Sequence, residues 1–552
     1  MGERPPGLSG SLPPLAGGDT LASTLRQRAT DRPREIFIIS ETNAGDVRSV
    51  TFAELAVRAT QLARLLRSLG IGPGSRFHVH MRNCIEFAEC LFAGAQLGAI
   101  MVPTSPDSTP DDLAYVLSHS GAVASISESA LLPGVLAARD MAPDLGEVLV
   151  ARSCQPVAGS RLLEDALAGV SEETIPEQAG PGDTAVILYT SGTTGWPKGV
   201  EVTHASLLFA GDVMAQALRI RPDDRWLVAL PLFHGNALYY STMSALVSGA
   251  SLALTESFEP TRWARQVVQH RATLASLFAT QARMVLTHPA DAAEGDAGLR
   301  VLVYAQNLAD RQVAEFESRF RCPLVQLYGM TETVAPPLIN PLYGERRNAS
   351  LGRPVPHMPL RVVNSAGQDV GAGQTGQLLV GGLPGRTIMR GYHNSADATA
   401  DVLRDGWLHT GDHVHVDADG YYYFDGRSSD LLKPRVDNVS TAEIERVVME
   451  NWAVQECVAV GVPDPIQAEA IKLYIVRQPG EPLTREEVYD WCAQRLAEHK
   501  RPNLIEFTDA LPHTPVGKVD RHALTASRGG GPGVARGPVS LGQGGTATVG
   551  RN

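Results

Sequence analysis

The stretch Tyr189–Val200 reads Tyr-Thr-Ser-Gly-Thr-Thr-Gly-Trp-Pro-Lys-Gly-Val and gathers glycines, hydroxyls and one lysine in a single turn. It follows the apolar run Ala185–Leu188, which is typical of a buried strand. The glycines let backbone N–H groups approach an anion, and Lys198 adds a positive charge. The spacing is not that of a Walker loop, which requires G-x-x-x-x-G-K-[ST]. The stretch therefore predicts an oligophosphate-binding turn, although alone it is also compatible with a Gly/Thr-rich surface turn.

Strand and helix patterns alternate on both sides of this turn. The sequence Thr51–Glu54 forms a capping box, which opens a helix that ends near Gly70. Strands are expected at 77–81, 99–102, 122–126, 185–189, 226–230, 251–254, 301–304 and 324–328, and further helices at 85–97, 206–218, 241–247 and 311–319. Such alternation predicts an α/β fold of doubly wound, mainly parallel sheets with helices on both faces.

The pattern changes after about Gly352. Short strands at 360–363, 376–380, 413–416 and 421–424, separated by Gly and Asp turns, predict a small antiparallel sheet or β-barrel-like subdomain. A compact α+β pattern follows Asp430 and contains a capping box at Ser440–Glu443. The predicted domains are a disordered N-terminus (1–18), a large domain (19–429, with the β subdomain at about 352–429), a small C-terminal domain (430–525) and a disordered tail (526–552).

The composition excludes several classes of function. The chain of 552 residues is 43% hydrophobic and 20% charged, which is ordinary for a soluble globular protein. Its net charge of −12 argues against a general binder of nucleic acid or anionic membranes. The six cysteines form no C-x-x-C pair, and Cys84 and Cys90 are expected to be buried free thiols. The longest apolar region, 85–103, is interrupted by two glutamates and predicts no membrane span, so a cytoplasmic protein is expected.

Further segments carry residues suited to a nucleotide. The sequence Tyr328–Thr333 directly follows an expected buried strand, where open α/β sheets bind ligands. Glu332 is a hard oxygen ligand of the kind that Mg²⁺ prefers. Asp412 offers a carboxylate to ribose hydroxyls, Arg427 a guanidinium, and Lys518 lies on a tight Gly turn near the end of the second domain. Each residue alone also fits a structural or solvated role.

In their order and spacing these segments resemble the adenylate-forming, or AMP-binding, superfamily, most of all the AMP-forming acyl-CoA synthetases. The resemblance covers roughly residues 20–525. It implies that ATP and Mg²⁺ are cofactors, that CoA is a co-substrate, and that the C-terminal domain is mobile about Asp430. The catalytic residues that it implies are Lys518, Glu332 and His234, and the metal-binding residues are Thr194 and Glu332. The nucleotide-binding residues that it implies are Thr190, Ser191, Gly192, Thr193, Thr194, Gly195, Lys198, Gln306, Tyr328, Gly329, Thr331, Asp412, Arg427 and Lys433.

The resemblance also assigns roles. The turn 190–198 would hold the β- and γ-phosphates, Tyr328 would stack on adenine, and Thr331 would reach the α-phosphate. Asp412 would bind the ribose hydroxyls, and Arg427 would contact the ribose and phosphates. Lys518 would swing into the site and contact both the attacking oxygen and the α-phosphate.

The segment Pro231–Asn236 would lie between the nucleotide and the acyl group, with His234 guarding the pocket. A satisfied core histidine is the alternative. Residues 236–242 and the pair Gln306 and Asn307 are expected to line the acyl end.

Two segments depart from the family pattern. Members that use CoA usually carry one or two glycines where Arg435 and Val436 stand, so side chains there would narrow the thiol channel. The loop 304–308 carries two amides, Gln306 and Asn307, in place of the usual small residues. Both changes concern the second substrate and the acyl group, whereas the ATP motifs are intact.

The sequence therefore predicts a ligase that adenylates a small carboxylic acid with release of pyrophosphate and then transfers the acyl group to CoA. Two alternatives keep the adenylation step: a relative in secondary metabolism that activates nitrite to diazotise an aromatic amine, and one that loads a carrier protein. A non-catalytic relative is a third alternative.

Overall fold

The computed structural model describes residues 19–155, 157–190, 197–290, 294–296, 298–427, 431–432, 439–464, 468–496, 500–514 and 519–526. The chain forms two compact units, which divide between Phe424 and Asp425. The predicted hinge residue Asp430 lies outside the described residues.

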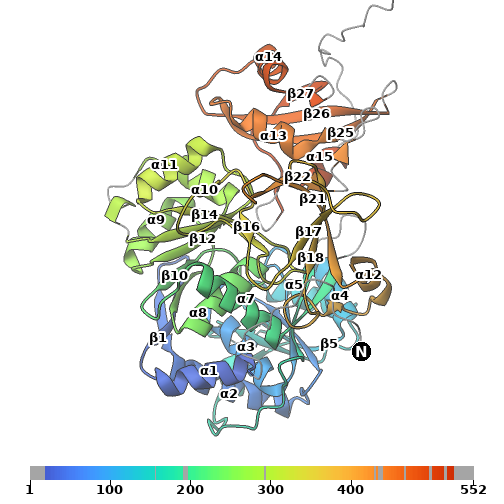
Figure 1. Cartoon of the computed structure of the whole chain (residues 1–552). Coiled ribbons are helices and arrows are strands. Elements are labelled where there is room, and N and C mark those ends of the chain that lie inside the picture. Colours follow the sequence, from blue (N-terminus) through green and yellow to red (C-terminus); the bar gives the residue numbers. More distant parts are fainter. Residues whose placement is uncertain are drawn as a thin grey trace, which may run out of the picture. The chain divides into compact units, whose positions relative to one another are not determined.

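Two large sheets form the core of the first unit (Figure 1). Among the described residues, one sheet has the strand order β19 (Gly391–Tyr392), β9 (Lys198–Thr203), β8 (Thr184–Thr190), β4 (Ile100–Pro103), β3 (Arg76–His80), β5 (Ala122–Glu128), β6 (Glu147–Ala151) and β7 (Arg161–Leu162). The other has the order β16 (Arg353–Pro354), β15 (Leu338–Ile339), β14 (Leu324–Tyr328), β13 (Val301–Ala305), β12 (Leu274–Phe278), β10 (Arg225–Val228), β11 (Ser251–Thr255), β1 (Ile36–Glu41) and β2 (Val47–Thr51). Central pairs such as β12–β13 and β3–β4 are parallel, whereas β8–β9 and the edge pair β1–β2 are antiparallel, which confirms the predicted α/β class.

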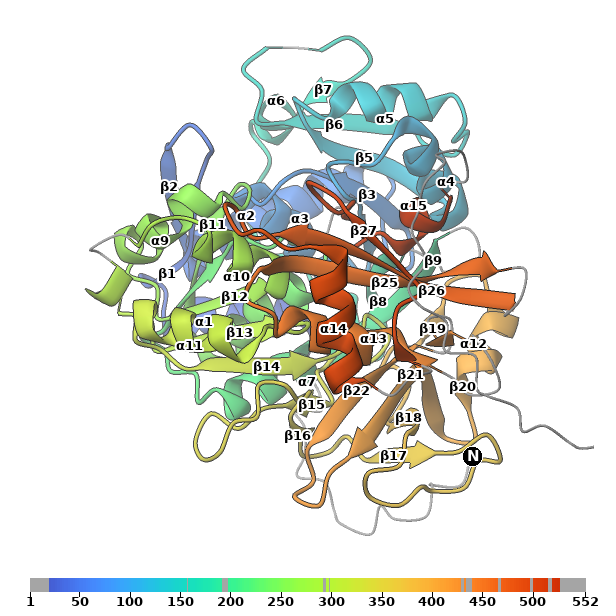
Figure 2. The same ribbon diagram turned by 90° about the horizontal axis from the view of Figure 1, so that it is seen from above.

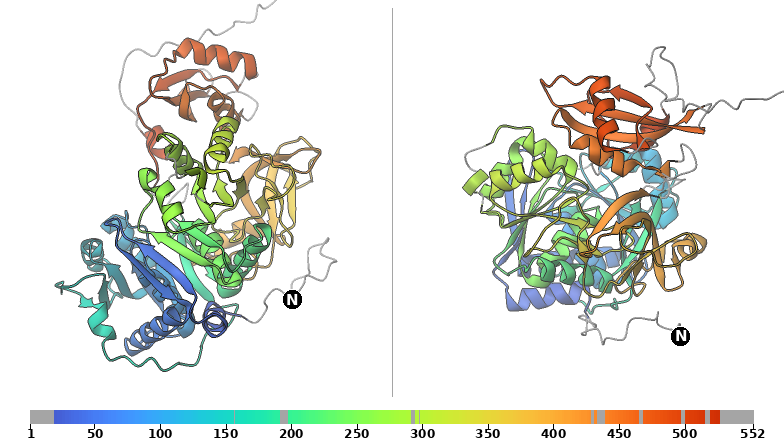
Figure 3. Two further views of the ribbon diagram at one scale, coloured as in Figure 1. Left: turned by 90° about the vertical axis from the view of Figure 1, so that its left-hand side faces the viewer. Right: turned by 45° about the horizontal axis from the view of Figure 1, so that its top comes forward.

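Helices cover both faces of these sheets (Figure 3). The helices α1 (Leu21–Asp31), α2 (Phe52–Ser68), α3 (Ile85–Leu97), α7 (His204–Ala217) and α8 (Met243–Ser248) pack with one another between the sheets, where α3 contacts β1 of one sheet and β4 and β8 of the other. Every residue of α3 is buried, because helices and strands of both sheets pack around it. The outer faces carry α4 (Pro110–Ser120) and α5 (Leu132–Arg139) on one sheet, and α9 (Pro260–Gln269), α10 (Ala279–Leu286) and α11 (Asp310–Phe320) on the other.

The local signal at Thr51 gave the start of α2 correctly. The Thr51 side chain accepts from the Glu54 N–H, and the Glu54 carboxylate accepts from the Thr51 N–H, so the predicted capping box is present. The predicted helix 241–247 is different in the structure: a π-helix, η1 (Asn236–Thr242), precedes α8. A return strand, β9, was also not predicted.

The β subdomain is an antiparallel sheet, as predicted (Figure 2). It contains β17 (Leu360–Val363), β18 (Gly376–Gly381), β21 (Trp407–Val416), β20 (Leu403–Arg404) and β22 (Tyr422–Arg427), with α12 (Ala396–Val402) beside it. The second unit has the predicted α+β character: β23 (Leu431–Leu432), β24 (Val439–Ser440), α13 (Thr441–Met449), β25 (Val454–Asp464), β26 (Ala468–Arg477), α14 (Arg485–Arg495), β27 (Leu504–Phe507) and α15 (Arg521–Ala526).

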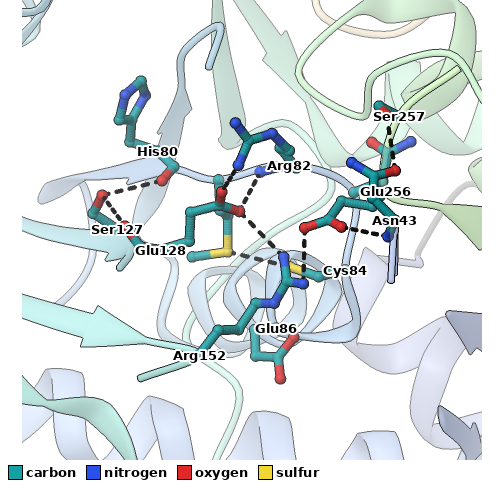
Figure 4. Close-up of polar contacts among 12 residues, drawn as sticks. Asn43, His80, Arg82, Cys84, Glu86, Ser127, Glu128, Arg152, Glu256 and Ser257 are labelled. Atoms are coloured by element: carbon teal, nitrogen blue, oxygen red, sulfur yellow. Dashed lines mark hydrogen bonds and ion pairs between the residues drawn. The ribbon is translucent and has the colours of Figure 1, made fainter. Parts of the chain in front are cut away.

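A charged network joins the two large sheets at the carboxyl ends of their strands (Figure 4). Glu128, at the end of β5, accepts from both Arg82 and Arg152. Arg152 also donates to Glu256, which follows β11 of the other sheet, at 2.9 Å. Glu128 is 3% exposed, and both of its oxygens have partners, which offsets the cost of burying its charge.

Cys84 and Cys90 are buried free thiols, as predicted, and burial raises the pKa of both well above its usual value. Within the described ranges, no helix has the combination of length and apolar character needed to cross a bilayer.

Candidate active site

The predicted phosphate-binding turn joins β8 to β9. Its residues Ser191, Gly192, Thr193, Thr194 and Gly195 lie outside the described residues, but both arms are described. Thr190 ends β8 opposite Lys198, the first residue of β9. Gly199 follows, and a Cβ there would lie 2.8 Å from Cγ2 of Ile187, so only glycine fits without a shift of its neighbours. The antiparallel hairpin therefore fixes both ends of the turn.

Glu332 and Lys198 share a neighbour that sequence reasoning missed. Glu332 is 7% exposed, and the Tyr392 hydroxyl donates to its Oε1 at 2.8 Å. The Lys198 Nζ lies 4.9 Å from the centroid of the Tyr392 ring. Tyr392 belongs to the two-residue edge strand β19, which has no strong pattern in the sequence. Tyr392 is brought to Lys198 because β19 pairs with β9, the strand that begins at Lys198.

Tyr328 and Asp412 are also brought together, although 84 positions separate them. The Tyr328 hydroxyl donates to Oδ2 of Asp412, which lies in β21 and is 1% exposed. The Asp412 N–H donates to Thr410 Oγ1 at 3.1 Å. The carboxyl end of β14 therefore faces the β subdomain through these two predicted nucleotide residues.

The turn after β14 is closely packed at Gly329. A Cβ at this position would lie 2.2 Å from the Tyr240 hydroxyl oxygen, so glycine is required unless the tyrosine moves. Thr331 is half-buried beside Glu332, and Arg427 is the last residue of β22, which pairs with the strand of Asp412.

The loop after β13 carries the two predicted amides. Gln306 follows β13 directly and has φ 73°, a left-handed conformation that is unusual for a side chain of this kind. Asn307 Oδ1 accepts from Gln326 Nε2 at 3.2 Å, and Gln326 Oε1 accepts from the Tyr304 hydroxyl. Tyr304 belongs to the outer core under α9–α11, so the Asn307 side chain is engaged on that outer face. The acyl-end role of Gln306 stays a prediction.

His234 precedes η1 at the carboxyl end of β10. Its Nδ1 accepts from the Asn236 N–H at 3.3 Å, and its ring packs edge-on against Phe278 at 5.5 Å between centroids. The segment that carries His234 is held by Asn83, which follows β3 of the other sheet: Asn83 Oδ1 accepts from the Leu232 N–H at 2.8 Å. Asn83 is a second residue that sequence reasoning missed.

The remaining predicted residues, Lys433 and Lys518, lie outside the described residues, as do Arg435 and Val436. In the part of the chain that the structure describes, no group of three or more His, Cys, Asp or Glu side chains is placed to hold a metal ion. Glu332 is thus the one predicted metal ligand that the structure describes.

Comparisons with known proteins identify the chain's family. The sequence profile of the AMP-binding enzymes matches residues 25–393, and that of the AMP-binding enzyme C-terminal domain matches residues 443–518. A crotonobetaine/carnitine–CoA ligase of Proteus mirabilis (strain HI4320) is 33% identical over 497 residues, which cover 88% of this chain and 95% of the relative.

Two solved structures share the fold. The anthranilate CoA ligase AuaEII in complex with anthranoyl-AMP has a TM-score of 0.86 at 26% identity, covering 93% of this chain and 97% of that one. A benzoate CoA ligase from Burkholderia xenovorans LB400 has a TM-score of 0.84 at 28% identity, covering 92% and 99%. The match of both profiles, in the order that the motifs predict, shows that this chain belongs to the AMP-binding family of adenylate-forming enzymes.

Proposed function

We propose that this protein is an ATP-dependent, AMP-forming ligase that joins a small carboxylic acid to CoA. One observation carries the proposal: four predicted ATP residues from distant segments gather in two contact groups, Lys198 with Glu332 around one tyrosine and Tyr328 with Asp412. The relatives named above, which are all CoA ligases, support CoA as the acceptor over a carrier protein. No contact in the described residues favours nitrite.

The chemistry requires charge neutralisation. A carboxylate that attacks the α-phosphate of ATP brings two anions together, so positioning and electrostatic stabilisation supply most of the rate enhancement. Lys198 would offset charge on the departing pyrophosphate, and Asp412 would hold the ribose hydroxyls with Tyr328 on the adenine. Lys518 would contact the attacking oxygen and the α-phosphate, and these contacts would strengthen in the transition state.

The residues at the site fit a magnesium ion bound together with the nucleotide. Mg²⁺ in such sites is usually held by one or two carboxylates, with substrate phosphates and waters completing its shell. A single described carboxylate, Glu332, matches that pattern, and its orientation is set because its Oε1 already accepts from Tyr392. Thr194 would add a hydroxyl. The ion supplies charge neutralisation at the phosphates when bound.

The second half-reaction would use the C-terminal domain. After adenylation, rotation about Asp430 would withdraw Lys518 and give the thiol of CoA a path to the acyl-adenylate. Arg435 and Val436 would shape this path. The acid itself is small: the relatives act on betaine-type and aromatic acids, so both classes belong in a substrate screen.

Pyrophosphate release tests the proposal. The purified chain is assayed with ATP, MgCl₂ and CoA against crotonobetaine, carnitine, benzoate, anthranilate and a series of short aliphatic acids, and the products are identified as acyl-CoA and AMP. Parallel reactions replace CoA with a carrier protein, or the acid with nitrite plus an arylamine. We expect an acid- and CoA-dependent signal that Asp412→Asn reduces strongly. Activity confined to the nitrite mixture would contradict the proposal.

A further inference from the structure

A short segment connects the two halves of the proposed ATP site. We call Met389–His393 the bridge segment; it contains β19, which pairs antiparallel with β9. At one end the Met389 N–H donates to the Glu332 carbonyl at 3.0 Å. At the other end the His393 N–H donates to the Gly199 carbonyl, next to Lys198, at 2.7 Å. Backbone hydrogen bonds thus tie the segment to both predicted phosphate motifs.

Contacts with Glu201 reinforce this connection. His393 Nδ1 lies 2.8 Å from Glu201 Oε1, and the Arg390 N–H donates to the Glu201 carbonyl at 2.9 Å. The Tyr392 N–H is bound to Thr399 Oγ1 at 2.9 Å. The backbone at Tyr392 is therefore held on both sides, and its side chain has little freedom to move away.

The Tyr392 hydroxyl acts on the buried carboxylate. Its bond to Glu332 Oε1 is a hydrogen bond to a charged acceptor, which is roughly twice as strong as one between neutral groups. The bond restrains the carboxylate through Oε1, and Oε2 is the oxygen that would be offered to a cation.

The Tyr392 ring acts on the lysine. A lysine ammonium within about 6 Å of an aromatic centroid is attracted to the ring face, and the Lys198 Nζ lies at 4.9 Å. The Lys198 ammonium has three donors and lies at the end of a flexible side chain. Without a contact, this side chain would sample many rotamers. The ring attracts the ammonium to the same tyrosine whose hydroxyl contacts Glu332.

We propose that Tyr392 is a positioning residue that uses its hydroxyl to orient Glu332 and its ring to place Lys198, so that the metal-binding carboxylate and the phosphate-binding ammonium are preorganised as one unit. The proposal rests on the proposed function, because it assigns ATP phosphates and a divalent cation to these two groups. No residue in the turn 191–196 is needed for it.

Two substitutions separate the hydroxyl from the ring. Tyr392→Phe removes the hydroxyl and keeps the ring, whereas Tyr392→Leu removes both. The readout is calorimetric binding of α,β-methylene ATP with and without MgCl₂, and the rate of pyrophosphate release is measured in parallel. For Tyr392→Phe we expect nearly unchanged binding without Mg²⁺, and a roughly 10-fold smaller gain in affinity when Mg²⁺ is added. For Tyr392→Leu we expect, in addition, Mg²⁺-free binding weakened about 2- to 30-fold.

Tyr423→Phe is the matched control. Its hydroxyl also donates to a carboxylate, Asp417 Oδ2, at 3.1 Å, but it touches neither Glu332 nor Lys198. The control should bind as the unchanged protein does. The inference is overturned if Tyr392→Phe binds identically to the unchanged protein in both conditions, or if the Phe and Leu variants are equivalent. Because binding needs no acid and no CoA, this result is independent of the substrate screen that tests the proposed function.

Discussion

Replacing Asn83 by alanine should destabilise the first unit and loosen the segment that carries His234. Asn83 is 3% exposed and uses its whole amide: Nδ2 donates to the carbonyls of Leu230 at 3.0 Å and Thr255 at 3.1 Å, and Oδ1 accepts from the Leu232 N–H at 2.8 Å. Thr255 ends β11, and Leu230 and Leu232 follow β10 of the same sheet, which does not contain β3, the strand before Asn83. The side chain therefore joins the two sheets, and it directly follows Arg82, which belongs to the charged network of Glu128.

The size of the effect follows from these three bonds. Each buried backbone group that loses its partner costs about 1–3 kcal/mol, and partial relaxation of the segment recovers some of this. We therefore expect Asn83→Ala to lower the free energy of unfolding by about 3–5 kcal/mol. Leu232 lies two residues before His234, so the KM for the acid should rise more than the KM for ATP.

Urea unfolding followed by tryptophan fluorescence measures the loss of stability, and pyrophosphate release with varied acid or ATP measures the two KM values. Asn364→Ala is the matched control, because Asn364 Oδ1 also accepts from two backbone N–H groups, of Ala366 and Gln368, but is exposed to water. The free energy of unfolding of the control should fall by less than about 1 kcal/mol, since water can bind the two backbone N–H groups that lose Asn364. A similarly small loss in Asn83→Ala would show that its three hydrogen bonds do not stabilise the first unit as described.

Three further predictions address other parts of the chain. Lys518→Ala should slow adenylation by roughly 10²–10³-fold and leave thiolysis of a supplied acyl-adenylate nearly intact. Separate rate measurements of the two half-reactions test this, and an equal loss of rate in both would contradict the role of Lys518. Gly329→Ala should destabilise the protein by about 1–3 kcal/mol in urea, and Tyr240→Phe in the same chain should recover part of this by removing the clashing oxygen; no recovery would argue against the clash. Burial lowers the pKa of His80 and His204 to about 4. As the pH falls toward 5, the unfolded chain therefore binds more protons at these histidines than the folded chain does. The free energy of unfolding should fall by about 2 kcal/mol per histidine between pH 7 and pH 5. Unfolding curves at the two pH values test this, and an unchanged loss in His204→Asn would contradict it.

Much of the fold could be predicted from the sequence, because its signals are local. The helix 85–97 and the strand 324–328 have in the structure the bounds that were expected, since apolar runs, caps and glycines act on residues a few positions away. Where local signals were weak or overridden by packing, prediction failed. The π-helix Asn236–Thr242 is buried at every position, and its form follows from its neighbours in space.

Residue type and spacing were enough to predict the α/β class, the order of the ATP motifs and the family. Which side chains meet became known from the structure alone: Tyr392 with Glu332 across 60 positions, and Tyr328 with Asp412 across 84. Such contacts depend on the order of strands within a sheet, and a strand's own residues specify its burial and not its neighbours. The physical reason is that hydrophobic patterning is short-ranged along the chain, whereas the preorganised charge of the site arises between segments that the fold brings together.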